Sequence, residues 1–357
     1  MHKWLRAWGI IAGLMLATQA HAGQEMFLKR AVWSEGRVWL LSDGGQVFSA
    51  SAQDTAPRFE YPGDKVLDIC VQNGQLRALV QDGDFTESPS WLLRHREDGH
   101  WVDDTAIPVQ GDKSWDYPPP PMALICDSDG VSILTYDRLL TVHGGKIGGI
   151  ALAGKIGHGL ATVLGTPDKL YVGFDMGEWG GGLQSIDRTT GQITQIENKT
   201  GLCDGLLNTE CDPVNGLVPS PWHPGCIVAA VGLKHMLPHG RVVEVCGDQI
   251  RRVYFKNYDM DIYGEKRDPP PDPSVEDFST VAFYGLAVEG KDVLAVGMDG
   301  LYHLHGDGTA DVESLPKFAA IEPFRLNFDR DDMVLVVTAI NARTAVGGAT
   351  PLLVPRD

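Results

Sequence analysis

Three side chains able to contact a ligand lie in one glycine-rich segment, GFDMGEWGGGL. Asp175 and Glu178 are carboxylates that can accept hydrogen bonds or transfer protons, and Trp179 offers a flat apolar ring with an N–H donor. Gly177 and Gly180 to Gly182 permit unusual backbone angles and close approach of a ligand. The segment is predicted either to bind a sugar ring or peptide side chain, or to cap the fold with Trp179 packed on a neighbouring loop.

Two histidines are further candidates for catalytic residues. His235 and His239 lie in the segment LKHMLPHG. Together with Asp175 and Glu178 they offer a general acid and a general base for a hydrolase or lyase that acts on a saccharide or lactone. Their spacing of four falls on a predicted hairpin tip and not on a helix face, so it does not predict a zinc site. The sequence contains no GxSxG motif and no P-loop, and whether the protein is an enzyme stays open.

A second aromatic group precedes a run of prolines in SWDYPPPPM. The prolines Pro118 to Pro121 keep this segment extended and stiff. Trp115, Asp116 and Tyr117 are therefore predicted either to contact a ligand or to pack as a strut at the edge of the fold.

Hard oxygen ligands gather in the segment LCDGLLNTECD. Asp204, Asn208, Glu210 and Asp212 have the oxygen atoms that calcium prefers, although the segment lacks the EF-hand pattern. This makes the segment a weak calcium candidate.

The six cysteines predict disulfide bonds, because an even count in an exported protein favours disulfides over metal sites. Cys226 and Cys246 lie symmetrically about Met236 in one predicted hairpin, which places them opposite each other. Cys203 and Cys211 are predicted to close a local loop. Cys70 and Cys126 each precede a turn in the same register, and two alternatives remain for them: a bridge between neighbouring strands, or two buried thiols.

Residues 1–22 have the features of a secretory signal peptide cleaved after Ala22. Lys3 and Arg6 precede an apolar run from Trp8 to Ala17, and no other apolar stretch is long enough to span a membrane. The mature chain is predicted to be soluble and either periplasmic or secreted. Loss of two of the 30 basic residues and none of the 47 acidic residues gives it a formal charge of −19, which argues against nucleic acid and favours cations or basic partners.

Short turns between apolar, β-rich runs recur along the whole chain, as in AVWSEGRVWLL and LAVEGKDVLAVG. Their spacing is typical of propeller blades. We predict an all-β fold, a seven-bladed β-propeller over residues 23–357, with an N-terminal strand from Glu25 to Leu28 completing the last blade. Six blades plus an irregular segment is the alternative.

Two hairpins, KLYVGFDMGEWGGGLQSIDRTTGQ and DVLAVGMDGLYHLHGDG, carry a family resemblance. They are similar to the propeller repeats in the sensor regions of bacterial two-component regulators, in which a strand resumes after its turn as Gly-Leu-aromatic. Gly300, Leu301 and Tyr302 match this pattern. The resemblance implies a fold and assigns no catalytic residues.

Loop lengths predict where a ligand binds. In a propeller, alternate connections emerge on opposite faces, and the long ones here are all expected on one face: 107–121, 198–212, 256–280 and the hairpin tips near Asp84, Trp179, His235 and Ala345. We therefore predict that this face binds a protein, a peptide or a cell-envelope glycan.

Overall fold

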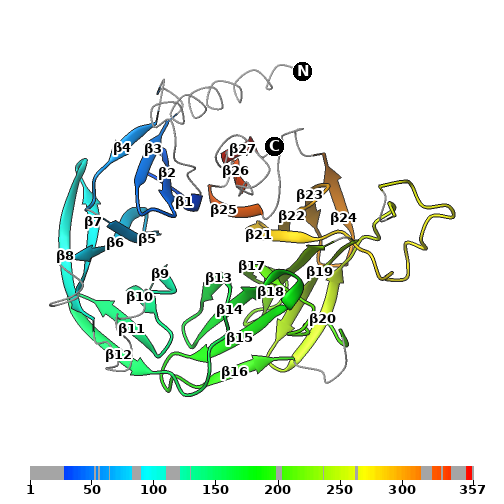
Figure 1. The fold of residues 1–357 in the computed structure, drawn as a ribbon, viewed down its shortest axis with the longest axis horizontal. Helices are drawn as coiled ribbons and strands as arrows, with labels where there is room; N and C mark the ends of the chain where they lie inside the picture. Colours follow the sequence, from blue (N-terminus) through cyan, green and yellow to red (C-terminus); the bar gives the residue numbers. More distant parts are fainter. Residues whose placement is uncertain are drawn as a thin grey trace. The chain divides into compact units, whose positions relative to one another are not determined.

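In a computed structural model of the protein, most of the residues that are described lie in β-strands (Figure 1). The structure describes residues 28–51, 54, 57–63, 65–82, 90–109, 121–128, 130–197, 203–235, 237–261, 264–314, 324–330, 333–338 and 351–355. The chain divides into two compact units, residues 1–152 with 320–357, and residues 153–319.

Tight turns join the strands, and the backbone conformation of these turns explains which residues occupy them. In the turns Glu35-Gly36 and Asn73-Gly74 all four residues have positive φ, between 50° and 79°. Two consecutive residues of positive φ match the right-handed twist of the flanking strands, and glycine adopts this conformation without strain. Each turn therefore pairs the strand before it with the strand after it.

The first unit contains three four-stranded antiparallel sheets and one three-stranded sheet. The strands of the first sheet are β1 (Leu28–Ser34), β2 (Arg37–Ser42), β3 (Val47–Ala50) and β4 (Arg58–Glu60). The second has β5 (Lys65–Gln72), β6 (Gln75–Asp82), β7 (Ser90–Glu97) and β8 (His100–Pro108). The third has β9 (Ala123–Asp127), β10 (Gly130–Leu134), β11 (Arg138–His143) and β12 (Lys146–Ala151). The three-stranded sheet has β25 (Phe324–Arg330), β26 (Met333–Thr338) and β27 (Pro351–Pro355).

The second unit contains three four-stranded antiparallel sheets. The first consists of β13 (Leu160–Gly165), β14 (Lys169–Asp175), β15 (Gly181–Asp187) and β16 (Ile193–Ile196), with the short 3₁₀ helix η1 (Gly177–Trp179) between β14 and β15. The next has β17 (Val214–Pro219), β18 (Ile227–His235), β19 (Leu237–Cys246) and β20 (Gln249–Tyr254). The last has β21 (Phe283–Glu289), β22 (Asp292–Gly297), β23 (Gly300–Leu304) and β24 (Ala310–Glu313).

Apolar side chains fill the space between neighbouring sheets. In the second unit, Val228 and Val242 of one sheet pack with Phe283 and Tyr302 of the next, and all four are fully buried. Trp39 and Ile69 make the equivalent contact between the first two sheets. Burial of such side chains contributes roughly 1.5–3 kcal/mol each, so the packing of sheet against sheet provides most of the stability of each unit.

The fold is an all-β propeller, as predicted, but the number of blades was wrong. Six sheets have the four strands of a complete blade, and the sheet β25–β27 has three. The alternative of six blades plus an irregular segment fits this arrangement. Leu28 does not complete the last blade, because it belongs to β1 and pairs with Ser42 of β2 in the first sheet, and β1 is not a strand of the sheet β25–β27. Residues 25–27 of the predicted closing strand lie outside the described residues.

Disulfide bonds were predicted, and three are present: Cys70–Cys126, Cys203–Cys211 and Cys226–Cys246. The first resolves the alternative left open by the sequence. It joins β5 to β9, the first strands of two neighbouring sheets, whose cysteine Cα atoms are 5.8 Å apart. These bonds indicate a protein that folds in an oxidising compartment. The described part of the chain contains no helix long and apolar enough for a membrane crossing.

Candidate binding face and its buried ion pairs

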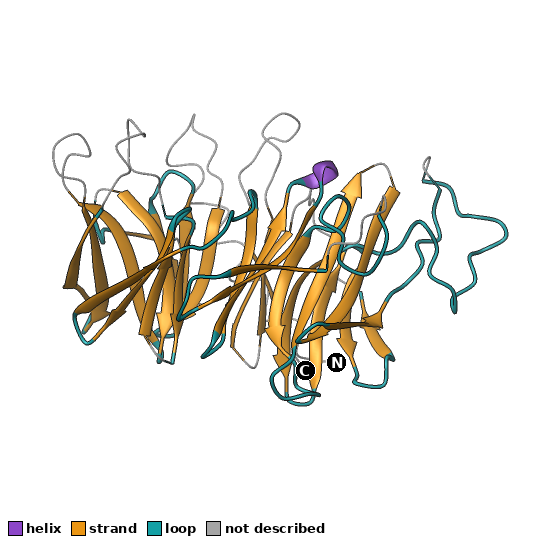
Figure 2. Ribbon diagram, turned by 90° about the horizontal axis from the view of Figure 1, so that it is seen from below, coloured by secondary structure: helices purple, strands orange, loops and turns teal. Residues whose placement is uncertain are grey.

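Three connections of the second unit and the first residues of strand β19 meet at one end of its strands. We call the surface they form the loop face and define it as residues 175–182, 203–212, 237–241 and 255–280. Figure 2 shows η1 at this end of the strands, and in Figure 1 the yellow connection between β20 and β21 extends away from the sheets. Backbone hydrogen bonds link these connections: Gly181 donates to the carbonyl of Thr209, and Thr280 donates to the carbonyl of Pro238.

The tip of the β14–β15 hairpin holds an exposed tryptophan on a fixed turn. The Asp175 carboxylate accepts a hydrogen bond of 2.7 Å from the Gly177 N–H, and the Met176 N–H donates to the Gly180 carbonyl at 2.9 Å. Within this turn Trp179 is 76% exposed, the highest value among the large hydrophobic side chains that the structure describes as exposed. Trp179 is therefore presented on the surface and is not packed as a cap on a neighbouring loop.

Gly180 and Gly181 of this tip accommodate another part of the chain and not a ligand. A Cβ atom at Gly180 would lie 2.1 Å from the Thr209 carbonyl oxygen, and one at Gly181 would lie 2.7 Å from the Cα of Pro213. The loop 203–212 thus packs directly against the hairpin backbone, which only glycine permits at this distance. This close approach fixes the position of η1.

Two of the four calcium candidates, Asn208 and Asp212, use their side chains for bonds within the loop 203–212. Buried Asn208 accepts a hydrogen bond from the Glu210 N–H at 2.8 Å and donates to the Asp204 carbonyl at 3.1 Å. The Asp212 carboxylate accepts a hydrogen bond of 2.7 Å from the Asn208 N–H. Among the described residues, Asp204, Glu210 and Asp212 do not form a compact group of three ligand atoms. Asp204 and Glu210 are exposed at the surface of the loop face.

Beneath this loop lies a chain of ion pairs centred on the buried side chain of Arg241. Arg241 donates from Nη1 to both carboxylate oxygens of Asp212 at 3.2 Å and from Nε to Glu276 at 2.8 Å. Glu276 also pairs with Arg252 at 2.5 Å, and the ring nitrogen Nε2 of His239 lies 2.8 Å from Asp212. The Asp212 and Arg241 side chains are only 1% and 7% exposed. These pairs connect the loop 203–212, through strand β19, to the connection 255–280.

The candidate acid and base residues are not assembled into a catalytic site among the described residues. His239 approaches a carboxylate, but that carboxylate, Asp212, is buried and neutralised by Arg241. Asp175 caps its own turn, and Glu178 lies on exposed η1. His235 ends strand β18, and its side chain lies outside the described residues.

A second buried carboxylate lies elsewhere in the same sheet. Glu244 of β19 accepts hydrogen bonds from Ser220, from His223 Nδ1 at 3.0 Å and from Arg251 Nε at 2.6 Å. Burial by itself raises the pKa of Glu244, but the hydrogen bonds from these three side chains outweigh burial and lower the pKa below its ordinary value.

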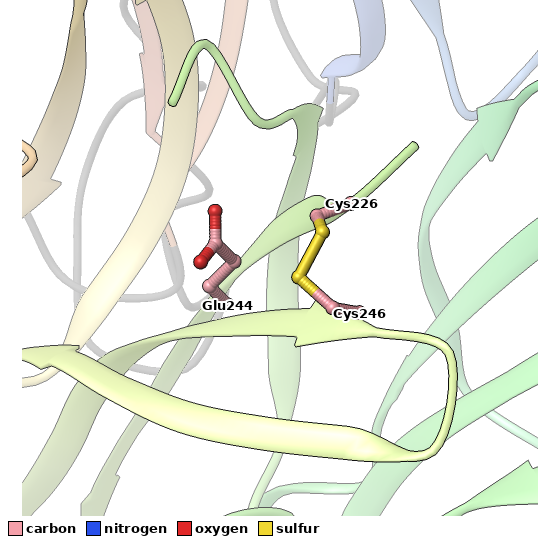
Figure 3. Close-up of side chains that lie close together, drawn as sticks. All are labelled: Cys226, Glu244 and Cys246. Atoms are coloured by element: carbon pink, nitrogen blue, oxygen red, sulfur yellow. A yellow bond between two sulfur atoms is a disulfide. The ribbon is translucent and has the colours of Figure 1, made fainter. Parts of the chain in front are cut away.

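Glu244 also lies beside the Cys226–Cys246 disulfide (Figure 3). Ligand atoms of these three residues lie within 4.8 Å of one another, the one such group among the described residues. Both sulfur atoms are bonded to each other, so they cannot act as thiolate ligands for a metal ion. In this state the group is structural.

The first unit contains a hollow of about 230 Å³ between its second and third sheets. Trp91, Ile107, Arg138 and Ile147 are among the residues that line it. The hollow is not lined by any of the predicted ligand-contact residues that the structure describes, Asp175, Glu178 and Trp179. Trp115, Asp116 and Tyr117 lie outside the described residues.

Comparison with known proteins supports the β-propeller fold and does not assign an activity or a ligand. No protein-family model and no curated protein matches the chain. The extracellular domain of the putative hybrid two component system BT4673 from B. thetaiotaomicron is similar in structure, with 14% identity and a TM-score of 0.52 over 93% of this chain and 38% of that chain. The predicted resemblance in fold is confirmed. Our chain spans about two fifths of the length of that protein, and at this identity no activity transfers.

Two further structures match over most of their own length. YCF48 bound to D1 peptide has 14% identity and a TM-score of 0.52 over 87% of this chain and 89% of that chain. The β-propeller domain of the Trilobed protease from Pyrococcus furiosus has 9% identity and a TM-score of 0.50 over 88% and 91%. Each shows a shared fold alone.

Sequence analysis did not identify Arg241, Glu276 and Glu244. One signal was present for Arg241 and Glu244: both are charged residues within the strand GRVVEVC, whose valines are buried. A charge in a buried strand requires a partner. Glu276 gave no such signal, because its partner Arg241 lies 35 residues away in the sequence.

Proposed function

We propose that this protein is an exported binding module and that its loop face docks a protein, a peptide or a cell-envelope glycan. One observation carries the proposal: Trp179 is 76% exposed on a turn whose backbone is fixed by hydrogen bonds to the loop 203–212. A large aromatic side chain that is already positioned loses little conformational entropy on binding, and such residues are frequent hot spots of interfaces.

Other features of the second unit support a contact role for this face. Met176, Val275 and Phe278 are also exposed, by 37%, 61% and 69%. Met176 lies in the same hairpin tip as Trp179, and Val275 and Phe278 lie close together in the connection 255–280. Exposed apolar side chains that lie together mark interaction sites more often than isolated ones do. YCF48, which has a similar fold, was solved with a bound peptide, so a chain of this fold is able to present a peptide-binding surface.

A hydrolase or lyase remains the weaker alternative. It needs an acid and a base that face one pocket, and Asp175, Glu178 and His239 do not line the described hollow of the first unit.

The binding proposal is tested with selected ligands and two matched variants. Peptides are selected from a random phage-displayed library on the immobilised protein, and purified envelope glycans are tested by co-sedimentation. We expect Trp179→Ala to weaken the best ligand by roughly tenfold or more. Phe59→Ala is the control, because Phe59 is 58% exposed in the first unit and lies outside the loop face. Equal affinities of the parent and Trp179→Ala contradict the proposal.

Export is a separate part of the proposal. The three disulfide bonds support it, and residues 1–22, the predicted signal peptide, lie outside the described residues. Mass spectrometry of the protein recovered from its native compartment is expected to give an N-terminus at Gly23. Recovery of the intact Met1 form in the cytoplasm contradicts this part.

A further inference from the structure

The charge of the loop face indicates which class of partner can bind to it. Exposed carboxylates lie in the segments 175–182 and 203–212 and along the connection 255–280. Lys266 is the one exposed lysine or arginine among the described residues of this face. The seven exposed acidic residues are Glu178, Asp204, Glu210, Asp259, Glu265, Asp268 and Asp272.

Three other basic residues of this face, Lys256, Arg267 and Arg241, are already paired with carboxylates of the protein itself. Lys256 pairs with Asp299 at 2.6 Å, and Arg267 pairs with Asp277 at 2.5 Å. Arg241 is buried between Asp212 and Glu276. The loop face therefore presents a negative electrostatic potential that these basic groups do not neutralise.

Apolar anchors lie among these carboxylates. Met176 and Trp179 lie on the hairpin tip, and Val275 and Phe278 lie on either side of Glu276. The Arg267 guanidinium lies 5.2 Å from the centre of the Phe278 ring and holds one of these anchors in place. The ion pairs from Asp212 through Arg241 to Glu276 connect the loop 203–212, whose backbone is hydrogen-bonded to the hairpin tip, to the connection that carries Val275 and Phe278.

We infer that the partner of the loop face is a cationic protein segment, one that carries lysine or arginine residues around at least one large apolar residue. This inference rests on the proposed binding function and specifies the partner class. The apolar residue packs on Trp179 or Phe278, while the basic residues pair with the exposed carboxylates and steer the segment to the face. Anionic envelope glycans are excluded by repulsion from the same carboxylates.

The test compares three labelled peptides of equal length that share a central Trp-Leu pair and differ only in their flanking residues: lysine, serine or glutamate. Binding to the full chain is measured by fluorescence anisotropy at about 50 mM and about 500 mM NaCl. We expect the lysine peptide to bind at least roughly tenfold tighter than the serine peptide at low salt and to lose this advantage at high salt, because salt screens exposed charges. The glutamate peptide is expected not to bind.

Two triple variants test whether the charge-dependent binding takes place at the loop face. Glu178→Gln with Asp204→Asn and Glu210→Gln removes three exposed charges from the hairpin tip and the loop 203–212. We expect this variant to weaken binding of the lysine peptide by roughly tenfold at low salt. Asp43→Asn with Glu97→Gln and Asp98→Asn removes three exposed charges from the first unit and is expected to change affinity by less than about twofold.

Three results overturn the inference: equal binding of lysine and glutamate peptides, equal loss in the two triple variants, or no binding of the lysine peptide at low salt. These results do not contradict the proposed binding function if the affinity of ligands from the random-library selection still falls in Trp179→Ala. If those ligands bind the parent and Trp179→Ala with equal affinity, the proposed binding function itself is contradicted.

Discussion

Arg241 donates two hydrogen bonds of 3.2 Å to the carboxylate of Asp212, and the two side chains are almost completely buried. The same guanidinium reaches Glu276, so one residue of strand β19 is bonded to both long connections of the loop face. A buried ion pair of this kind contributes little net stability compared with apolar packing, but it is costly to break. Its role is to fix where the loops lie.

Replacement of Arg241 by methionine is expected to destabilise the protein by about 3–5 kcal/mol, because Asp212 and Glu276 lose their buried partner. The free energy of unfolding is measured by urea denaturation. Arg58→Met is the control, since Arg58 is 63% exposed where it pairs with Asp54, and its loss is expected to cost less than about 1 kcal/mol. A similar loss of unfolding free energy in the two variants would show that the buried ion pair is no more costly to break than an exposed one.

Gly180→Ala and Gly177→Ala are expected to differ although both glycines have positive φ. At Gly180 the new methyl group meets the Thr209 carbonyl, whereas at Gly177 nothing lies within 4 Å. Gly177→Ala is therefore expected to cost only the backbone strain, about 1–2 kcal/mol, and Gly180→Ala clearly more. Acrylamide quenching of tryptophan fluorescence reports in addition whether Trp179 changes its exposure. Equal stability of the two variants contradicts the close contact.

Removal of each disulfide is expected to destabilise the protein in the order of its loop length. The cysteines are 56, 20 and 8 residues apart for Cys70–Cys126, Cys226–Cys246 and Cys203–Cys211. Chain entropy predicts losses of about 4, 3 and 2.5 kcal/mol for the paired Cys→Ser variants. Urea denaturation of the three variants without reductant checks the order. A larger loss for Cys203–Cys211 than for Cys70–Cys126 would contradict it.

Glu244 is expected to make stability fall in acid. Its folded-state pKa is lowered below the ordinary value of 4.5, so its contribution is present above this pH and is lost as the pH falls through the folded-state pKa. Glu244→Gln should therefore be less stable than the parent near neutral pH, and the difference should shrink below about pH 4.5. Urea midpoints across this range measure it, and a difference that is constant with pH would contradict the prediction.

His305 is expected to act in the opposite direction. Hydrogen bonds to Asp292 and Asp311 raise the pKa of His305 above its ordinary value of 6.5. Its contribution is therefore present below this pH and is lost as the pH rises through the folded-state pKa. The urea midpoint of His305→Gln should fall below that of the parent at about pH 5.5 and approach it above the raised pKa. A histidine pKa below 6.5 measured by NMR would contradict the assignment.

Much of the β architecture was readable from the sequence because it is local. The turns at Glu35-Gly36 and Asn73-Gly74 lie between apolar runs that pair with each other, and the Cys226–Cys246 hairpin is symmetric about its tip. In each case the pairing partner is the next strand along the chain, so backbone conformation at the turn and alternation of side chains are sufficient.

The candidate site depended on contacts that no local pattern encodes. The sequence predicted that Gly180 to Gly182 admit a ligand, and the structure fills that space with the loop 203–212. It predicted Asp212 as an oxygen ligand, and the structure pairs it with Arg241, 29 residues later in the chain. The residue types determined that acids, aromatics and cysteines would lie on hairpins and loops. Only the packing of sheet against sheet decided which of them meet, because a buried charge takes whichever partner the tertiary structure brings within hydrogen-bonding distance.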